Sequence, residues 1–152
     1  MRAVNVLLFE GFTTMDALGP AEALSRALDG GRKCYEIEYF SVAGGLVGSS
    51  TSAKIWTRKL DEIAKFDILI VPGGFAAREL VHEAEFITTL DELARRHEYV
   101  IAVCTGSVLL AKTGFLGGME ATSNKLSWQW ATSEALNVRW ILAARWCVSG
   151  KF

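Results

Sequence analysis

Residues 99–113 read YVIAVCTGSVLLAKT, and this stretch decides how the chain folds. Its first part, Tyr99–Val103, is a short run of apolar, β-branched and aromatic residues that predicts a buried strand. Ser107–Thr113 then shows a helical pattern, so only residues 104–106 separate the strand from the helix. A strand that turns so sharply into a helix is typical of a parallel α/β sheet.

The alternation of strand and helix extends over most of the chain. Further apolar runs predict three more buried strands: Val4–Phe9, Glu36–Val42 and Phe66–Val71. Helical patterns lie at three other places: Leu18–Leu28, Glu85–His97 and Leu126–Leu136. The turn-rich segment Ala43–Trp56 adds a hairpin or an edge strand. We therefore expect one domain spanning residues 1–152, with a doubly wound and mostly parallel sheet.

Composition and charge exclude several classes of protein. The 152 residues are 51% hydrophobic and 22% charged, which is typical of a globular domain with a real core. The net charge is −1 and the basic residues are scattered, so we expect a small-molecule partner and neither nucleic acid nor a membrane. The N-terminal apolar run lacks a cleavage site, and the three cysteines lack metal-like spacing. A cytoplasmic location and no metal are expected.

Cys104 is the first candidate functional residue. It lies where a strand turns into a helix, with Gly106 permitting a tight backbone and Ser107 opening the helix, as in a nucleophile elbow. A helix N-terminus carries partial positive charge, so this position predicts a lowered pKa and a thiolate at neutral pH. The alternative is a cysteine that acts as a small core residue. The glycine and the serine favour the functional interpretation.

The ends of the other strands supply further candidates, because ligands bind beyond the carboxyl ends of strands in open α/β sheets. Gly73 and Gly74 follow a buried strand, and their backbone could approach a ligand closely enough to form an oxyanion site, together with Gly106. A Gly-Gly pair is also common in ordinary turns. Asp16 and Glu22 follow the first strand, where each could exchange a proton with the thiol or stabilise a helix N-terminus.

Other chemistry-bearing residues are interpreted as structural. His82 and His97 lie in and after polar helical segments, which predicts surface positions for both. Cys34 and Cys147 lack the elbow pattern, and the tryptophans are interpreted as core or interface packing.

Three motifs taken together resemble the ThiJ/PfpI superfamily of class I glutamine amidotransferase-like proteins, and within it the isonitrile hydratase-like branch. They are DALGPAE at 16–22, VPGG at 71–74 and AVCTGS at 102–107. The resemblance implies a flavodoxin-like three-layer sandwich, usually dimeric, that needs no metal or organic cofactor. We therefore expect a homodimer.

The resemblance also implies roles for individual residues. Cys104 matches the nucleophile, Asp16 and Thr105 match the residues that assist it, and Glu22 matches the glutamate after Gly-Pro. Isonitrile hydratases convert an isonitrile to an N-substituted formamide, and a thioimidate on the cysteine would be the intermediate.

Two departures from the family pattern bear on function. Many relatives carry Thr-His-Trp where this chain has TSNK at 122–125, so a histidine often found near the site is absent, although some relatives carry Asn-Lys there. Relatives also continue beyond Phe152 through a further strand and a long helix. Without them we expect apolar sheet surface that is exposed or covered by another chain.

The expected function is a cysteine-dependent hydratase or hydrolase of small molecules, similar to isonitrile hydratase, provided that the shorter C-terminus leaves the pocket competent. One alternative is a non-catalytic module that senses a ligand or an oxidant. Another is an intracellular protease or amidase. Thr105 counts against the last alternative, because protease- and amidase-like members commonly carry histidine after the nucleophile.

Overall fold

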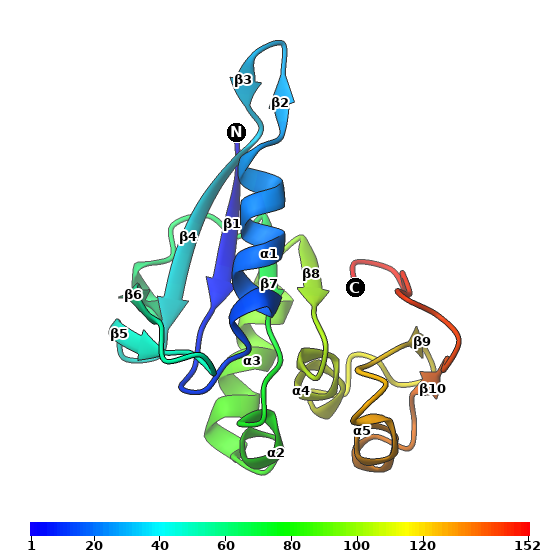
Figure 1. Cartoon of the computed structure of the whole chain (residues 1–152). Coiled ribbons are helices and arrows are strands. Elements are labelled where there is room, and N and C mark those ends of the chain that lie inside the picture. The colour runs from blue at the N-terminus through cyan, green and yellow to red at the C-terminus, as the bar shows by residue number, and fades with distance from the viewer.

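The computed structural model describes residues 1–152 and is built around a six-stranded sheet (Figure 1). Its strands are β1 (Arg2–Leu7), β4 (Tyr35–Ser41), β5 (Gly45–Gly48), β6 (Lys54–Lys59), β7 (Ile68–Val71) and β8 (Tyr99–Ala102). The order is β5-β6-β4-β1-β7-β8, and all neighbours run parallel except β5 and β6, which are antiparallel. The expected mostly parallel sheet is confirmed.

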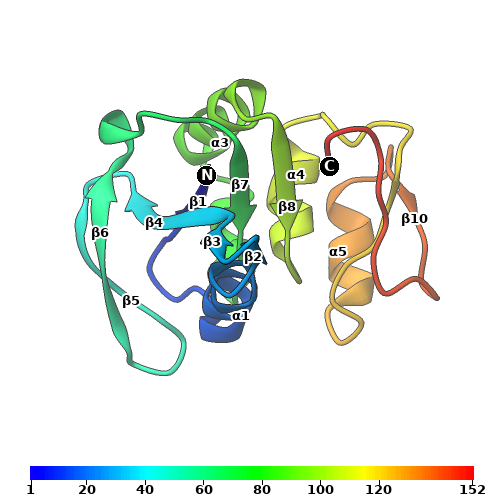
Figure 2. The same cartoon turned by 90° about the horizontal axis from the view of Figure 1, so that it is seen from above.

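Helices cover both faces of this sheet. They are α1 (Thr14–Ser25), α2 (Ala77–Leu80), α3 (Ala84–Arg96), α4 (Gly106–Lys112) and α5 (Trp128–Glu134), with a 3₁₀ turn at Leu60–Glu62. Figure 2 shows α1 on one face of the sheet and α3 on the other, so the fold is the expected three-layer sandwich. Two small sheets complete the chain: β2 (Leu28–Asp29) with β3 (Arg32–Lys33), and β9 (Glu120–Ala121) with β10 (Arg139–Trp140).

The core lies around the two central strands. All of β7 is buried, and β1 is buried from Ala3 to Leu7. Strands that helices cover on both faces need apolar side chains in both directions, which explains why these runs are continuous rather than alternating. Leu90 of α3 and Leu109 of α4 are fully buried against this core.

Two local expectations differ from the structure in their bounds. The first helix begins at Thr14, earlier than the predicted Leu18, and ends at Ser25. Pro20, which can open a helix, lies inside this one. The earlier start places Asp16 in the first helical turn. The hairpin expected within Ala43–Trp56 is present as β5 and β6, with β6 continuing to Lys59.

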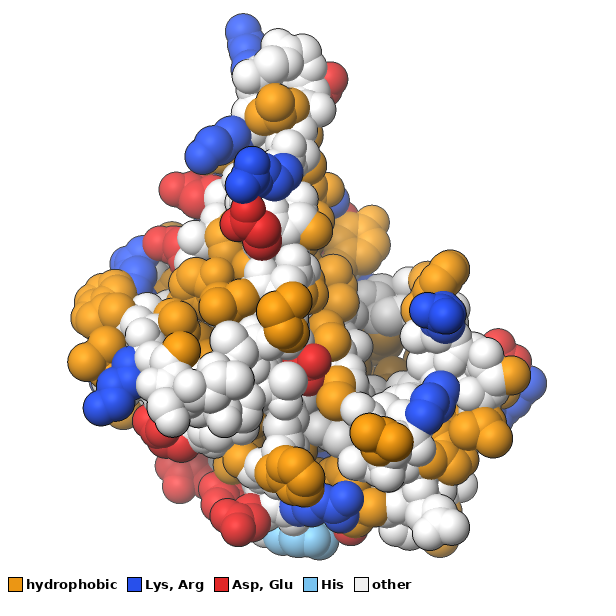
Figure 3. Space-filling model, in the orientation of Figure 1, with side chains coloured by type: hydrophobic (Ala, Val, Ile, Leu, Met, Phe, Trp, Pro, Cys, Tyr) orange, Lys and Arg blue, Asp and Glu red, His pale blue; other side chains and the backbone are white.

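The surface carries charges of both signs. Figure 3 shows lysine and arginine side chains scattered over the visible face rather than gathered into a stripe. None of the helices combines the length and the apolar character needed to cross a lipid bilayer.

The prediction of a surface position for His97 is wrong, because its side chain is buried and only 2% exposed. His82 is exposed, as predicted. The Nδ1 of His97 lies 2.7 Å from the carbonyl oxygen of Leu93, and its Nε2 lies 2.9 Å from the amide nitrogen of Asn5. That amide also donates to the carbonyl of Lys65, which fixes its orientation. His97 therefore donates through Nδ1 and accepts through Nε2, so it is neutral, and burial lowers its pKa.

The neutral state of His97 predicts a pH-dependent stability. Below a pH of about 6.5 the unfolded chain binds a proton at this histidine that the folded chain excludes, so stability falls as the pH falls. Urea unfolding should show lower stability at about pH 5.5 than at about pH 7.5, with about 1 kcal/mol of the loss absent in His97→Gln. His82→Gln is the matched control and should behave like the wild type. Equal pH dependence in all three proteins would contradict the assignment.

Candidate active site

Three segments meet at the carboxyl edge of the sheet. Since β1, β7 and β8 are adjacent and parallel, the residues that follow them lie side by side. Asp16 comes from α1 after β1, Gly73 and Gly74 follow β7, and Cys104 follows β8. The structure thus gathers the residues that the sequence placed at separate strand ends.

The elbow at Cys104 depends on a close approach of backbone segments. Cys104 has a φ of 56°, a left-handed conformation that is uncommon for a residue with a side chain. Two residues later, a Cβ on Gly106 would lie 2.2 Å from the carbonyl oxygen of Val71 and 2.8 Å from that of Pro72. Only glycine fits there, and its absence of a side chain lets α4 begin directly against the loop after β7.

Asp16 links α1 to the loop after β7 and to the thiol. Its Oδ2 accepts a hydrogen bond of 3.2 Å from the backbone N–H of Gly73, and its carboxylate also accepts one from the Cys104 thiol. The carboxyl is half-buried, and this burial raises its pKa despite the two hydrogen bonds. A carboxylate in this position can take the thiol proton and return it.

The sequence-based expectation of a lowered cysteine pKa is wrong. Burial raises the pKa of Cys104, and the negative charge of Asp16 raises it further. Hydrogen bonds from Asn124 and from the backbone of Thr105 act in the opposite direction. The helix N-terminus is therefore not the dominant influence, and the thiol holds its proton unless Asp16 accepts it.

Thr105 is buried and faces the glycine loop. Its Oγ1 accepts from the backbone N–H of Gly74 at 3.0 Å and lies 3.2 Å from the carbonyl oxygen of the same residue. The N–H of Gly73 is engaged by Asp16, and the N–H of Gly106 donates to the carbonyl of Val103. All three glycine donors are thus occupied, and an oxyanion role for them stays a prediction.

Glu22 does not join the cluster. It lies six residues beyond Asp16 on α1, which corresponds to a rotation of about 240° around a helix, so the two side chains face different directions. Its carboxylate is exposed and pairs with Arg26 at 2.7 Å. The structure gives Glu22 a surface ion pair instead of a place beside the thiol.

Asn124 is the residue near the thiol whose role the sequence did not reveal. Its Nδ2 donates a hydrogen bond of 3.1 Å to the sulfur of Cys104. The preceding Ser123 donates to the carbonyl oxygen of Cys104 at 3.2 Å, and Ser107 donates to the same oxygen at 2.8 Å. The available signal is the TSNK segment at 122–125, which lacks the histidine of many relatives and carries the Asn-Lys of some.

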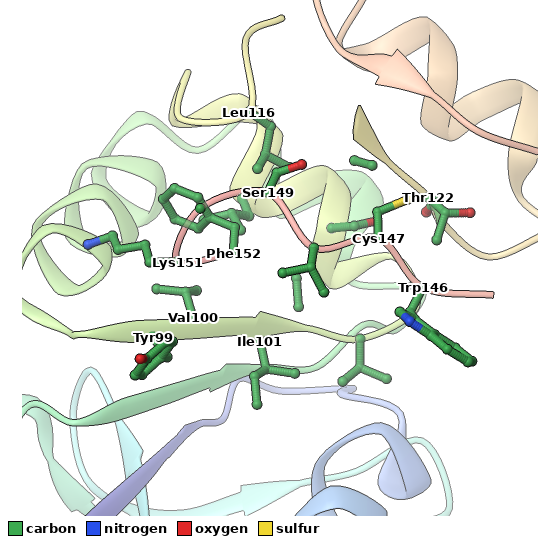
Figure 4. Close-up of a pocket in the computed structure, with 18 of the residues that line it drawn as sticks. Tyr99, Val100, Ile101, Leu116, Thr122, Trp146, Cys147, Ser149, Lys151 and Phe152 are labelled. Carbon is green, nitrogen blue, oxygen red and sulfur yellow. The ribbon is translucent and has the colours of Figure 1, made fainter. Parts of the chain in front are cut away.

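A cavity of about 740 Å³ reaches Cys104. Figure 4 shows it between β8 and the C-terminal segment, with Trp146, Cys147 and Phe152 among its walls. The segment is tied to α3, because the Lys151 ammonium donates to the carbonyl oxygens of Ala94 and His97. Most of the lining is apolar.

Comparison with known proteins adds four findings. Residues 2–138 match the DJ-1/PfpI family. The isonitrile hydratase of Pseudomonas putida is 27% identical over 80% of this chain and 51% of the enzyme. The HTH-type transcriptional regulator GbdR of Pseudomonas aeruginosa is 31% identical over 80% of this chain and 33% of the regulator. The crystal structure of Drosophila melanogaster DJ-1beta matches with a TM-score of 0.80 at 20% identity, covering 99% of this chain and 78% of that one. The chain thus spans about half the length of the hydratase.

The close approach at Gly106 predicts a selective effect of added methyl groups. Gly106→Ala places a Cβ against backbone oxygens and should lower the unfolding free energy by about 1–3 kcal/mol or more. Gly19→Ala is the matched control inside α1, where the nearest atom is the Met15 Cε at 3.6 Å, and it should stabilise by about 0.5–1 kcal/mol. Chemical denaturation compares the two variants. Equal stabilities would show that α4 can move away from the loop at no cost.

Proposed function

Because the chain belongs to the DJ-1/PfpI family, we propose that it is a cysteine-dependent hydratase or hydrolase of a small molecule, with Cys104 as the nucleophile. One observation carries the proposal. The Cys104 thiol is hydrogen-bonded to the Asp16 carboxylate, its sulfur accepts an N–H from the Asn124 amide, and it lines a cavity. A nucleophile beside its proton acceptor is the arrangement that covalent catalysis needs.

Asp16 is the proton acceptor in this proposal. His97 is bound to Asn5 and Leu93, and His82 is exposed near Glu134, so neither histidine contacts the thiol. The raised pKa of Asp16 suits this role, because a carboxyl with a higher pKa binds the thiol proton more readily. Thr105 orders the loop that holds Asp16 in place, through its hydrogen bonds with Gly74.

An isonitrile is the substrate class that we propose for this site, guided by the similarity to isonitrile hydratase. Asp16 removes the thiol proton, and the sulfur bonds to the terminal isonitrile carbon, which takes that proton to give a thioimidate. Water then adds to the same carbon, with its proton passing through Asp16. The carbon–sulfur bond breaks, releasing an N-substituted formamide and the thiol.

The cavity supports a small substrate. A volume of about 740 Å³ falls within the range of about 300–1,000 Å³ that is usual for small-molecule sites. Its mostly apolar walls suit an organic substituent on the isonitrile nitrogen, and Ser123 and Asn124 line it together with Cys104.

A ligand-sensing module is the second candidate function. The observation that favours it is the similarity to the regulator GbdR, of which this chain matches one third. A sensor would bind a ligand in the same cavity without turnover. Ligand binding that persists in Cys104→Ser, together with no conversion by the wild type, would favour the sensor.

Loss of turnover in a cysteine variant tests the enzymatic proposal. Cys104→Ser should abolish conversion of an alkyl or aryl isonitrile to its formamide, followed by mass spectrometry, because a serine hydroxyl is far harder to deprotonate than a thiol. Cys34→Ser is the matched control, since Cys34 is also a free cysteine, and it should keep wild-type turnover. Equal turnover in Cys104→Ser and the wild type would exclude Cys104 as the nucleophile.

The carboxylate variant should separate two effects of Asp16. Asp16→Asn removes the negative charge that raises the pKa of Cys104, so iodoacetamide should alkylate the thiol faster at neutral pH. Turnover should fall by about 10²–10⁴-fold, because the proton acceptor is lost. Asp29→Asn, in the exposed β2–β3 hairpin, should change neither rate. If alkylation and turnover both became faster in Asp16→Asn, or both became slower, a role of Asp16 in proton transfer would be contradicted.

A further inference from the structure

The orientation of the Asn124 side chain is fixed by its own loop. Its Oδ1 accepts hydrogen bonds from the backbone N–H groups of Leu126 at 2.9 Å and Ser127 at 3.1 Å. Since only an amide oxygen can accept from two N–H donors, the other end of the amide is the nitrogen. That nitrogen is 3.1 Å from the Cys104 sulfur, so the contact is an N–H donor directed at the nucleophile.

The loop holds Cys104 at two atoms. Ser123 donates to the carbonyl oxygen of Cys104, and Asn124 donates to its sulfur. The backbone of this cysteine is in the left-handed region, so the side-chain direction depends on contacts that hold it there. Two adjacent residues of one loop therefore fix both the backbone and the side chain of the nucleophile.

One charged group acts most strongly on the sulfur. From α1 it is the Asp16 carboxylate, and α4 has no acidic residue in its first turn. In the loop after β9, the Lys125 ammonium contacts the Thr122 hydroxyl and lies 4.5 Å from the Trp128 ring. Four further charged residues line the cavity: Arg2, Glu120, Arg145 and Lys151.

We propose that Asn124 is a positioning residue that stabilises the thiolate of Cys104 through an uncharged N–H donor and so sets the pH range in which this site is nucleophilic. The inference rests on the proposed function for its catalytic meaning. Because a side-chain amide does not titrate near neutral pH, it lowers the pKa of the thiol without adding a second ionisation to the site. Asp16 remains the only group that exchanges a proton with the sulfur.

The test is the pH dependence of Cys104 alkylation by iodoacetamide, in which the thiolate displaces iodide and forms a carbon–sulfur bond. Asn124→Leu removes the donor at similar size. This substitution should raise the midpoint of the pH profile of alkylation by about one pH unit. At pH values below that midpoint, alkylation should be about tenfold slower than in the wild type. Asn124→Asp keeps an oxygen for Leu126 and Ser127 but places a carboxylate near the sulfur, so its midpoint should rise further. Mass spectrometry of the Cys104 peptide reports the rate.

Controls separate this proposal from structural damage and from the proposed function. Asn137→Asp introduces the same change at an exposed position and should keep the wild-type midpoint. Circular dichroism confirms folding, and Asn124→Asp decides the matter if Asn124→Leu does not fold. A wild-type midpoint in a folded Asn124 variant would overturn the proposal. Alkylation needs no substrate, so shifted midpoints without isonitrile turnover would support the role of Asn124 and count against the proposed reaction.

Discussion

The contact between Gly106 and the backbone oxygens of Val71 and Pro72 is the constraint on which the site depends. It brings the loop after β7 against the turn after β8, and the rest follows from that proximity. A Cβ on Gly73 would lie 2.5 Å from the Thr105 hydroxyl and 3.0 Å from the Asp16 carboxylate. The two loops and the start of α1 therefore leave no room for a side chain at Gly73 or Gly106, and larger residues there would force them apart.

The sequence was sufficient to predict the sheet and the place of the site, because both follow from patterns that the chain displays directly. Apolar strands covered on both faces give continuous runs, and parallel strands bring their carboxyl ends to one edge. The direction of the Glu22 side chain could not be predicted without the start of α1. Pro20 suggested a later start than the observed one. His97 is buried through polar contacts with Asn5 and Leu93, which no periodicity shows. The role of Asn124 depends on the conformation of its loop, and Asn124 lies 20 residues from Cys104 in the sequence.

The pKa of Cys104 shows why position alone is a poor guide to reactivity. A helix N-terminus contributes a partial charge near the sulfur, whereas Asp16 contributes a full negative charge within hydrogen-bonding reach. The full charge of Asp16 and the burial of the thiol outweigh the helix N-terminus, so the pKa of Cys104 is raised. A thiol that keeps its proton at rest is also less prone to adventitious oxidation, because the thiolate is the reactive form. The same carboxylate that restrains the thiol is the group that activates it in the proposed reaction.

The outer edge of β8 is shielded by the C-terminal segment. This strand ends the sheet order, and Tyr99 and Ile101 on it are 44% and 40% exposed. Its Val100 N–H binds the carbonyl oxygen of Lys151, which is the contact by which the C-terminal segment shields this edge. Exposed apolar edge strands are starting points for strand addition between molecules. Conditions that detach this short segment from α3 would uncover the edge and should favour strand addition between molecules.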